Sequence, residues 1–325
     1  MSHPVPTTVS EAAALAGQLR EAVSRVFVGQ HATVEHTLCA LLAGSHILLE
    51  GVPGLGKTLL VKALARTFGG QFSRIQFTPD LMPADITGHT LYDARTSQFV
   101  MRRGPVFANL VLADEINRAP AKTQAALLEV MQEGQVTIEG RAMQLPPPFL
   151  VLATQNPIEQ EGTYALPEAQ LDRFLLKVLI DYPAIEDERA LVQASCDGRT
   201  GDRLDVDSIG AIASPEQLVA MQQLTSSLRV DAAVLDYAVR IVRSTREWPG
   251  IAVGAGPRGG IALVRAARAA ALLAGRDYVT PDDVKRIALP ALRHRISLNP
   301  EAEIEGLTVD GVLSTLLSRT DAPRS

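Results

Sequence analysis

The stretch Gly51-Val-Pro-Gly-Leu-Gly-Lys-Thr58 follows directly on the apolar run His46-Ile-Leu-Leu-Glu50. It fits the phosphate-loop pattern G-x-x-x-x-G-K-[ST], in which glycines let backbone N–H groups close around phosphate groups. Lys57 supplies a mobile cation, the Thr58 hydroxyl can ligate Mg²⁺, and the helix expected to begin at Lys57 adds its positive end. The stretch therefore predicts a strand, a nucleotide-binding loop and a helix, in that order.

Short apolar runs alternate with helical patterns over the first two-thirds of the 325 residues. This alternation is typical of a mainly parallel sheet covered by helices. Continuous apolar runs favour strands that are buried on both faces. The five predicted strands are 46–50, 73–77, 109–114, 149–154 and 175–180.

Two hairpins are predicted beside this sheet. A helix over 120–133, with Gly134 as its stop, leads into β-like segments 135–138 and 141–145, which are split by a Glu-Gly pair. Two further short segments, 90–92 and 98–101, indicate a second hairpin inserted before the third strand.

The strand pattern disappears after about residue 181, and well-marked helices replace it. Ser214-Pro-Glu-Gln217 and Thr280-Pro-Asp-Asp283 both carry a capping residue followed by Pro and then acidic or amide side chains, as helix starts do. The change predicts two domains. We expect an α/β domain over 1–183, and a connecting segment with a small all-helical domain over 184–325.

The composition excludes several classes of protein. With 46% apolar and 21% charged residues the chain is ordinary and globular, and the sequence contains neither a signal peptide nor an apolar run long enough to span a membrane. We therefore expect a cytoplasmic protein without membrane insertion. The net charge of −5 argues against a nucleic-acid partner. Cys39 and Cys196 fit no metal or disulfide spacing.

Two acidic residues follow the third predicted strand, and hydrolysis needs such groups beside a phosphate loop. Asp114 can hold Mg²⁺ together with Thr58, and Glu115 can orient or deprotonate the attacking water. Asn156 follows the next strand, where ligands bind at the carboxyl ends of parallel strands, so it can contact the γ-phosphate or the water. The sequence thus predicts an ATP-hydrolysing site with Mg²⁺ as cofactor.

Seven stretches between 28 and 174 together form a pattern that is far more specific than the phosphate loop alone. They are Val28-Gly-Gln30, Gly51 to Thr58, Phe77-Thr-Pro-Asp-Leu-Met-Pro-Ala-Asp-Ile-Thr-Gly88, Gly104-Pro-Val-Phe107, Leu112-Ala-Asp-Glu-Ile-Asn-Arg-Ala-Pro120, Ala153-Thr-Gln-Asn-Pro157 and Glu161-Gly-Thr-Tyr-Ala-Leu-Pro-Glu-Ala-Gln-Leu-Asp-Arg-Phe174. In these stretches and in their order the sequence resembles the MoxR family of AAA+ ATPases. The helical part resembles the family's lid less sharply, through 256–258 and 278–284.

The resemblance implies a fold and a set of site residues. The fold would be an AAA+ phosphate-loop core with a five-stranded sheet, a helix-2 insert and a pre-sensor-1 hairpin, followed by the lid. Asp114 and Glu115 resemble Walker B, Asn156 sensor 1, Arg173 the arginine finger for a neighbouring subunit, and Arg258 the lid arginine called sensor 2. The implied nucleotide contacts are Gly51, Val52, Pro53, Gly54, Leu55, Gly56, Lys57, Thr58 and Leu59, with Val28, Gly29 and Gln30 at the adenine.

The resemblance also implies an activity and partners. It implies a homo-oligomeric ring, hexameric in the family, that hydrolyses ATP to remodel or mature a protein client or to insert its metal cofactor. A separate adaptor with a von Willebrand factor A domain typically serves such a ring. Three alternatives stay open at this point: a nucleic-acid motor related to replicative helicases, a chelatase motor subunit, and a phosphotransferase acting on a small molecule.

Overall fold

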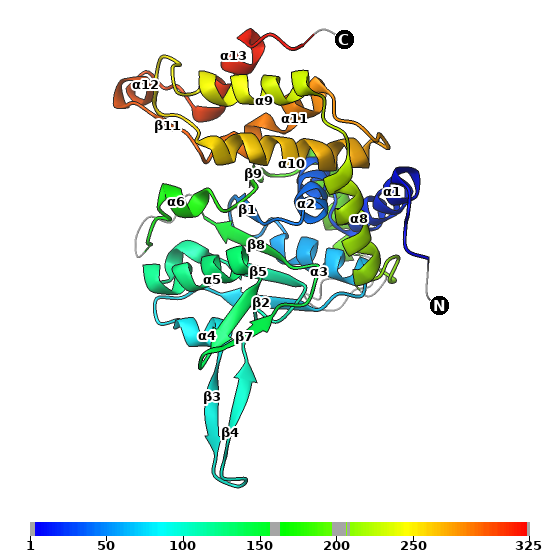
Figure 1. The fold of residues 1–325 in the computed structure, drawn as a ribbon, viewed down its shortest axis with the longest axis vertical. Coiled ribbons are helices and arrows are strands. Elements are labelled where there is room, and N and C mark those ends of the chain that lie inside the picture. The colour runs from blue at the N-terminus through cyan, green and yellow to red at the C-terminus, as the bar shows by residue number, and fades with distance from the viewer. Residues whose placement is uncertain (1–3, 157–162, 197–205, 207–208, 324–325) are drawn as a thin grey trace.

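The computed structural model describes residues 4–156, 163–196, 206 and 209–323 (Figure 1). Its centre is a five-stranded parallel sheet with the strand order β2-β5-β8-β1-β9. Each predicted strand is present, and its ends agree to within about one residue. The strands are β1 (Ile47–Glu50), β2 (Phe72–Gln76), β5 (Leu110–Asp114), β8 (Leu150–Gln155) and β9 (Leu176–Leu179).

The two faces of the sheet pack into separate cores, because successive residues of a strand point to opposite sides. Ile47 and Leu49 of β1 lie in one core with α1 (Val9–Val26), α2 (His31–Leu42) and α3 (Lys57–Thr67). Leu48 lies in the other core, which includes residues of α5 (Ala121–Glu133). Since all three side chains are fully buried, β1 and the loop that leaves it are held firmly between the two layers.

Strand β2 differs from the expectation that every strand is buried on both faces. Only Ile75 is buried among its five residues, and Arg74 and Gln76 are exposed. The prediction was wrong here because β2 is an edge strand, with β5 on one side only. This position lets polar side chains lie beside the end of β5, where Gln76 pairs in register with Asp114.

Both predicted hairpins are confirmed as antiparallel pairs. One of them extends well beyond the sheet (Figure 1), after the short helix α4 (Pro83–Thr87). Tyr92 and Phe99 pair across this hairpin with ring centroids 5.3 Å apart, and they are 57% and 76% exposed. The strands are β3 (Gly88–Asp93) with β4 (Gln98–Arg103), and β6 (Gln135–Ile138) with β7 (Arg141–Gln144).

The chain after β9 is mainly helical, as predicted, and adds one short antiparallel pair of strands. Its central helix is α10, which packs its many alanines against α9 and α11 and against α1 and α2 of the first part. The elements are α7 (Ile185–Cys196), α8 (Pro215–Ser227), α9 (Ala232–Ser244), β10 (Ile251–Val253), α10 (Pro257–Leu273), α11 (Pro281–Leu292), β11 (Ser297–Leu298), α12 (Pro300–Ile304) and α13 (Val309–Arg319). The domain boundary at 183 stays a prediction. No helix in the described ranges is long and apolar enough to cross a membrane.

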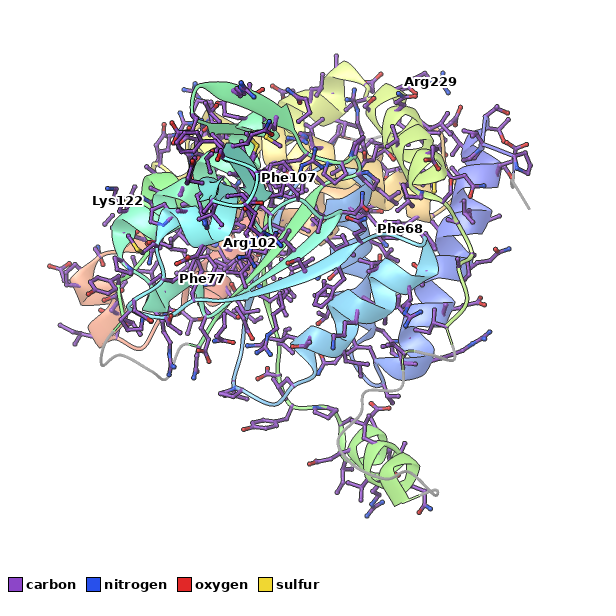
Figure 2. The ribbon with its side chains drawn as sticks, turned by 90° about the horizontal axis from the view of Figure 1, so that it is seen from below. Phe68, Phe77, Arg102, Phe107, Lys122 and Arg229 are labelled. Atoms are coloured by element: carbon purple, nitrogen blue, oxygen red, sulfur yellow. The ribbon has the colours of Figure 1, made fainter. Side chains whose placement is uncertain are left out.

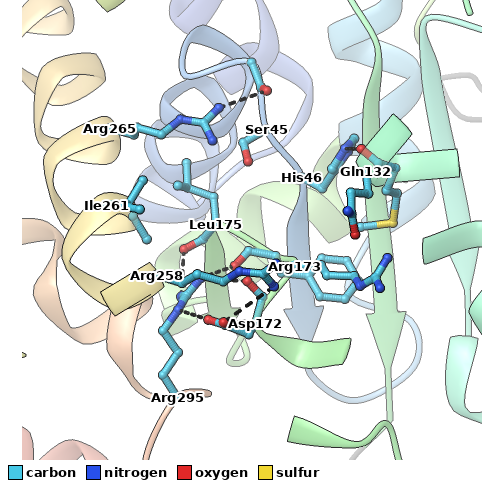
Figure 3. A pocket seen from close by; sticks show the side chains of 14 residues that line it. Ser45, His46, Gln132, Asp172, Arg173, Leu175, Arg258, Ile261, Arg265 and Arg295 are labelled. Atoms are coloured by element: carbon cyan, nitrogen blue, oxygen red, sulfur yellow. Dashed lines mark hydrogen bonds and ion pairs between the residues drawn. The ribbon is translucent and has the colours of Figure 1, made fainter. Parts of the chain in front are cut away.

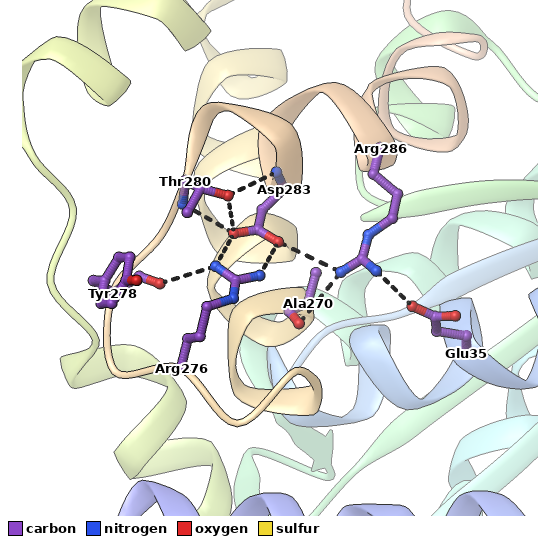
Figure 4. Close-up of polar contacts among 7 residues, drawn as sticks. All are labelled: Glu35, Ala270, Arg276, Tyr278, Thr280, Asp283 and Arg286. Atoms are coloured by element: carbon purple, nitrogen blue, oxygen red, sulfur yellow. Dashed lines mark hydrogen bonds and ion pairs between the residues drawn. The ribbon is translucent and has the colours of Figure 1, made fainter. Parts of the chain in front are cut away.

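A network of charged side chains ties the helical part to α2 (Figure 4). Asp283 accepts two hydrogen bonds of 2.6 Å from the Arg276 guanidinium and one of 2.9 Å from the Thr280 N–H. Burial by itself raises the pKa of Asp283, but these hydrogen bonds lower it on balance below its usual value. Arg286 then bridges Asp283, at 3.5 Å, and Glu35 of α2, at 3.4 Å. Paired charges therefore anchor the helical part of the chain to α2.

A buried histidine makes the fold sensitive to acid. His46 accepts a hydrogen bond from the Val151 N–H on Nδ1, at 3.0 Å, and Nε2 lies 2.9 Å from the Met131 carbonyl oxygen. Burial lowers the pKa of His46 to about 4, although the Met131 carbonyl opposes this shift. The unfolded chain, with a pKa near 6.5, therefore binds more protons than the folded one between pH 6.5 and 4.

We expect the free energy of unfolding to be highest above about pH 6.5 and to fall by about 3 kcal/mol as the pH drops to 4, through His46 alone. Urea unfolding at a series of pH values measures this slope. The variant His46→Asn should reduce this slope, and the part that remains belongs to the other buried histidines, His36 and His294, whose pKa values burial also lowers. The same change at exposed His31 should leave the slope as in the wild type. An unchanged slope in His46→Asn contradicts the assignment.

Candidate functional site

The loop between β1 and α3 depends on its glycines. Gly54 and Gly56 have φ values of +87° and +75°, the left-handed region that favours glycine. Gly51 is required by space, since a Cβ there would lie 2.5 Å from the Ile180 carbonyl oxygen. The loop ends where α3 begins at Lys57, so the free N–H groups of the first helical turn face it.

Lys57 folds over this loop. Its Nζ donates a hydrogen bond of 2.5 Å to the Gly51 carbonyl oxygen. Burial lowers the pKa of Lys57, and the nearby carboxylates of Asp114, Glu115 and Glu50 oppose that shift. The ammonium group is thus placed at the loop and surrounded by negative charge.

Asp114 is held from two neighbouring strands. Its Oδ1 accepts a hydrogen bond of 2.6 Å from the Thr154 hydroxyl on β8. Its Oδ2 accepts bonds of 2.5 Å and 3.1 Å from Nη2 and Nε of Arg74 on β2. Thr154 is buried, so it can hold the Asp114 carboxylate in one orientation.

Glu115 has a strained backbone. Its φ of +55° and ψ of 52° lie in the left-handed region, which costs a residue with a side chain roughly 1–3 kcal/mol. The Glu115 N–H donates 2.8 Å to the Thr154 hydroxyl, and its carboxylate accepts 2.8 Å from Gln76. The Glu115 carboxylate also forms an ion pair with Arg118, at 3.2 Å. A strained backbone that several hydrogen bonds and an ion pair hold in place is typical of a functional residue.

One cavity of about 350 Å³ brings the predicted residues together. Lys57 and Thr58 enter it from α3, Asp114 and Glu115 from the end of β5, and Asn156 from the end of β8. The remaining lining residues are Pro53, Gly54, Leu55, Gly56, Leu59, Arg74, Thr154 and Gln155. A cation, a hydroxyl, two carboxylates and an amide therefore converge where a phosphate loop meets the carboxyl ends of parallel strands, which is where ligands bind in such sheets.

A second cavity of about 400 Å³ continues from the first, since both include 53–56 and Leu59. Val28 and Gln30 line it, together with Val26, Phe27, Tyr182, Pro183, Glu188 and Leu191. Gly29 does not line it; the Asp187 side chain lies against this glycine instead. The cavity is mostly apolar in its lining residues and suits a flat aromatic base.

Arg173 and Arg258 lie away from both of these cavities. They line a third cavity, of about 450 Å³, between the sheet and the lid (Figure 3). Arg173 donates 2.8 Å to the Leu128 carbonyl oxygen, and its buried Nε has no hydrogen-bond partner among the described residues. Arg258, at the start of α10, lies 3.8 Å from the Asp172 carboxylate and is 58% exposed. These two arginines share one surface, but not the phosphate loop of their own chain.

Arg295 fixes the backbone around Arg173. Its Nε donates 2.8 Å to the Asp172 carboxylate, and Nη2 donates 2.7 Å to the Phe174 carbonyl oxygen (Figure 3). Nη1 donates 3.2 Å to the Leu175 carbonyl oxygen. The lid therefore holds both residues that flank Arg173.

The sequence did not reveal four of the residues described above. Arg74, Gln76 and Thr154 hold the two acidic side chains, and Arg295 holds the segment around Arg173. For the first two, the available signal is a polar residue at the end of a strand adjacent to β5. Such a residue can be recognised only when the pairing of β2 with β5 is known, and the order of the strands along the chain does not reveal which strands pair.

Comparison with known proteins agrees with the fold and the site. A family model described as "ATPase family associated with various cellular activities (AAA)" matches residues 46–176, and a model of the AAA lid domain matches residues 243–316. The chain is thus an AAA+ phosphate-loop protein with its lid.

Similarity to individual proteins shows which family of AAA+ proteins the chain belongs to. The chain is 46% identical to uncharacterized protein YeaC of Bacillus subtilis, over 95% of each chain, and 46% identical to chaperone MoxR1 of Mycobacterium tuberculosis, over 93% of this chain and 81% of that one. A crystal structure from Cytophaga hutchinsonii, described only as a candidate ATPase, has a TM-score of 0.89 at 40% identity and covers 97% of each chain. A magnesium-chelatase subunit of Acidiphilium rubrum is more distant, at 30% over 65% of this chain and 60% of its own. The chain belongs to the MoxR family of AAA+ ATPases, which confirms the resemblance.

Proposed function

We propose that this protein hydrolyses ATP in a Mg²⁺-dependent reaction and uses the energy to remodel or mature a protein client. The observation that carries the proposal is the single cavity that Lys57, Thr58, Asp114, Glu115 and Asn156 share. A phosphate loop alone would explain binding. Two carboxylates and an amide at the same place explain hydrolysis as well.

The binding half of this proposal assigns each cavity a part of the nucleotide. The phosphates would lie on the loop backbone and the first turn of α3, with Lys57 on the terminal phosphates. The base would enter the adjoining cavity beside Val28 and Gln30. A shared wall, formed by the residues from Pro53 to Gly56, supports one ligand spanning both cavities.

The donor set also fits a magnesium ion. The Thr58 hydroxyl and the Asp114 carboxylate line the same cavity, and both are oxygen donors of the kind that Mg²⁺ takes. When bound, Mg²⁺ neutralises charge on the phosphate oxygens. The chain's own residues would do the rest: Glu115 orients and deprotonates the attacking water, and Asn156 contacts the water or the γ-phosphate.

A neighbouring subunit would complete the site. Arg173 and Arg258 lie in a separate cavity and so serve the nucleotide of another copy better than their own. A ring of identical subunits in head-to-tail contact, hexameric in this family, supplies such a neighbour at every site. An arginine that reaches the γ-phosphate in this way stabilises the charge of the transition state.

Client handling would fall to the β3–β4 hairpin. The hairpin extends away from the sheet (Figure 1). Its paired aromatic side chains Tyr92 and Phe99 are exposed, so they can contact an unfolded or loosely folded segment. We propose that the adaptor with a von Willebrand factor A domain and the client that it delivers are proteins separate from this chain. The similar M. tuberculosis protein is named a chaperone, which supports this part of the proposal.

The direct test is nucleotide binding and phosphate release by the purified protein with and without Mg²⁺. We expect Lys57→Ala to weaken ATP binding roughly 10- to 100-fold, because it removes a charge-assisted contact to phosphate. Lys62→Ala, a change of the same kind on the same helix, should leave binding intact. Equal affinities in the two variants, or no release of phosphate by the wild type, contradict the proposal.

A further inference from the structure

The lid carries a groove that the proposed ATPase site does not use. It runs between α9 and α10 with a volume of about 530 Å³. Its apolar members include Leu235, Val239 and Ile261, which are 42%, 51% and 59% exposed. We call this surface the lid groove; its other lining residues are Ala238, Val242, Arg243, Arg246, Pro257, Gly260, Val264, Arg265 and Arg268.

Four arginines give the lid groove a strong positive charge. None of Arg243, Arg246, Arg265 and Arg268 forms an ion pair with an acidic side chain in the described part of the chain. Arg246 donates to the Ala255 carbonyl oxygen, Arg265 donates to the carbonyl oxygens of Ala43 and Gly44, and Nε of Arg268 is buried without a described partner. An apolar floor with uncompensated arginines suits an acidic amphipathic helix.

Helix α7 has the complementary character. Glu186, Asp187 and Glu188 stand in its first turn against a single arginine, Arg189, which is paired with Glu186 at 2.9 Å. Ile185 and Val192 are two turns apart, so they lie on the same face, and they are 63% and 60% exposed. Glu188, three residues after Ile185 and four before Val192, lies on this face as well, and together with Leu191 it lines the cavity proposed for the base.

We propose that α7 of one copy of this chain packs into the lid groove of the next copy. In Figure 2, α7 stands apart at the bottom, whereas Arg229, in the connection that leads into α9, is at the top, so α7 and the start of α9 lie on opposite sides in this view. A contact between opposite sides joins copies head to tail, and it closes into a ring when the rotation from copy to copy completes a circle. The inference deepens the proposed function, on whose ring it rests.

The lengths of the two surfaces agree. Helix α7 has 12 residues, which span about 18 Å at 1.5 Å per residue. The lid groove takes its lining from 235–246 of the α9 region and 257–268 of α10, stretches of the same length. The length of α7 therefore matches the length of the two segments that line the lid groove.

The same contact also brings the two halves of the proposed site together. The lid groove shares Ile261 and Arg265 with the cavity that holds Arg173 and Arg258. Helix α7 shares Glu188 and Leu191 with the nucleotide side. When α7 of one copy packs into the lid groove of its neighbour, the nucleotide cavity of that copy lies toward Arg173 and Arg258 of the neighbour. A second copy of this chain therefore explains both the apolar, positively charged lid groove and the joining of the two halves of the site. An unrelated acidic peptide would explain the groove alone.

Cross-linking of the full chain tests this contact. Two cysteines are introduced, Val192→Cys on α7 and Val239→Cys in the lid groove, with Cys196→Ser; Cys39 is retained because it is buried and burial raises the pKa of its thiol to about 12. With Mg²⁺ and ATP, a short bifunctional maleimide should produce a ladder of covalent oligomers up to the ring. Each single-cysteine variant, and Val192→Cys paired with Ser318→Cys on α13, should give no ladder.

A charge test supports the cross-link. Val239→Glu should raise the protein concentration needed for assembly at least about tenfold, because it places a carboxylate on the apolar floor of the contact. Ser318→Glu, also exposed on the lid, should leave assembly unchanged. A ring that hydrolyses ATP and yet gives neither the ladder nor this shift overturns the docking of α7 but leaves the proposed function standing. A chain that stays monomeric with Mg²⁺ and ATP overturns both.

Discussion

Replacing Glu115 by Gln is expected to slow ATP turnover by roughly 10²–10⁴ while ATP affinity stays near that of the wild type. The amide keeps the size of the side chain but accepts no proton from water. Binding should survive, because the loop, Lys57 and Asp114 are unchanged. Phosphate release under saturating ATP, together with equilibrium binding of a fluorescent nucleotide, separates the two quantities.

The control for this substitution is Glu129→Gln, the same change at an exposed position of α5. It should alter neither turnover nor binding. Thermal unfolding should be similar for both variants, since the backbone strain at position 115 is common to Glu and Gln. Unchanged turnover in Glu115→Gln would remove this residue from the mechanism.

The same variant addresses the client. A protein that binds ATP but does not hydrolyse it should keep its client and adaptor bound, so affinity capture with Glu115→Gln should retain them in the presence of ATP. Capture with Lys57→Ala, which we expect to bind ATP poorly, is the matched negative control. Identical sets of proteins from both variants would argue against ATP-dependent client handling.

The sequence predicted the sheet well because its central strands are apolar without interruption. β1, β5 and β8 lie inside the sheet, and their residues are buried and apolar up to the polar residues Glu50, Asp114 and Thr154 near their carboxyl ends. β2 was harder to characterise, since an edge strand tolerates Arg74 and Gln76. The physical reason is that edge position depends on strand order, and strand order is a tertiary property.

The residues of the candidate site likewise fall into a group that the sequence predicts and a group that it does not. Lys57, Thr58, Asp114, Glu115 and Asn156 follow strands or a loop at positions that a local rule identifies, and the structure brings all five to one cavity. Their supports were not predicted, because each acts across the sheet or from the lid. Thr154 bridges the two acids only because β8 pairs with β5. Arg295 reaches Asp172 from 123 residues further along the chain.

Replacing Arg173 by Ala is expected to lower the ATP turnover of the assembled ring by roughly 10³–10⁵, the range for an arginine that completes a neighbour's site. The side chain is held for such a role: one nitrogen donates to the Leu128 carbonyl oxygen, while Arg295 fixes the backbone on either side. Arg229→Ala, which removes an exposed arginine paired with Asp277, should have no such effect. Turnover by the wild type should also rise with protein concentration as the ring forms.

A mixture of two inactive variants decides whether Arg173 acts in its own subunit or the next one. Lys57→Ala lacks the nucleotide half of the site, and Arg173→Ala lacks the half given to the neighbour. In a head-to-tail ring of equal parts, an interface is complete when an Arg173→Ala subunit binds ATP beside a Lys57→Ala subunit, which random mixing gives at about one quarter of the interfaces. Activity should therefore return to about a quarter of the wild-type rate. If Arg173 served its own nucleotide, every site in the mixture would lack one group, and mixing would restore nothing.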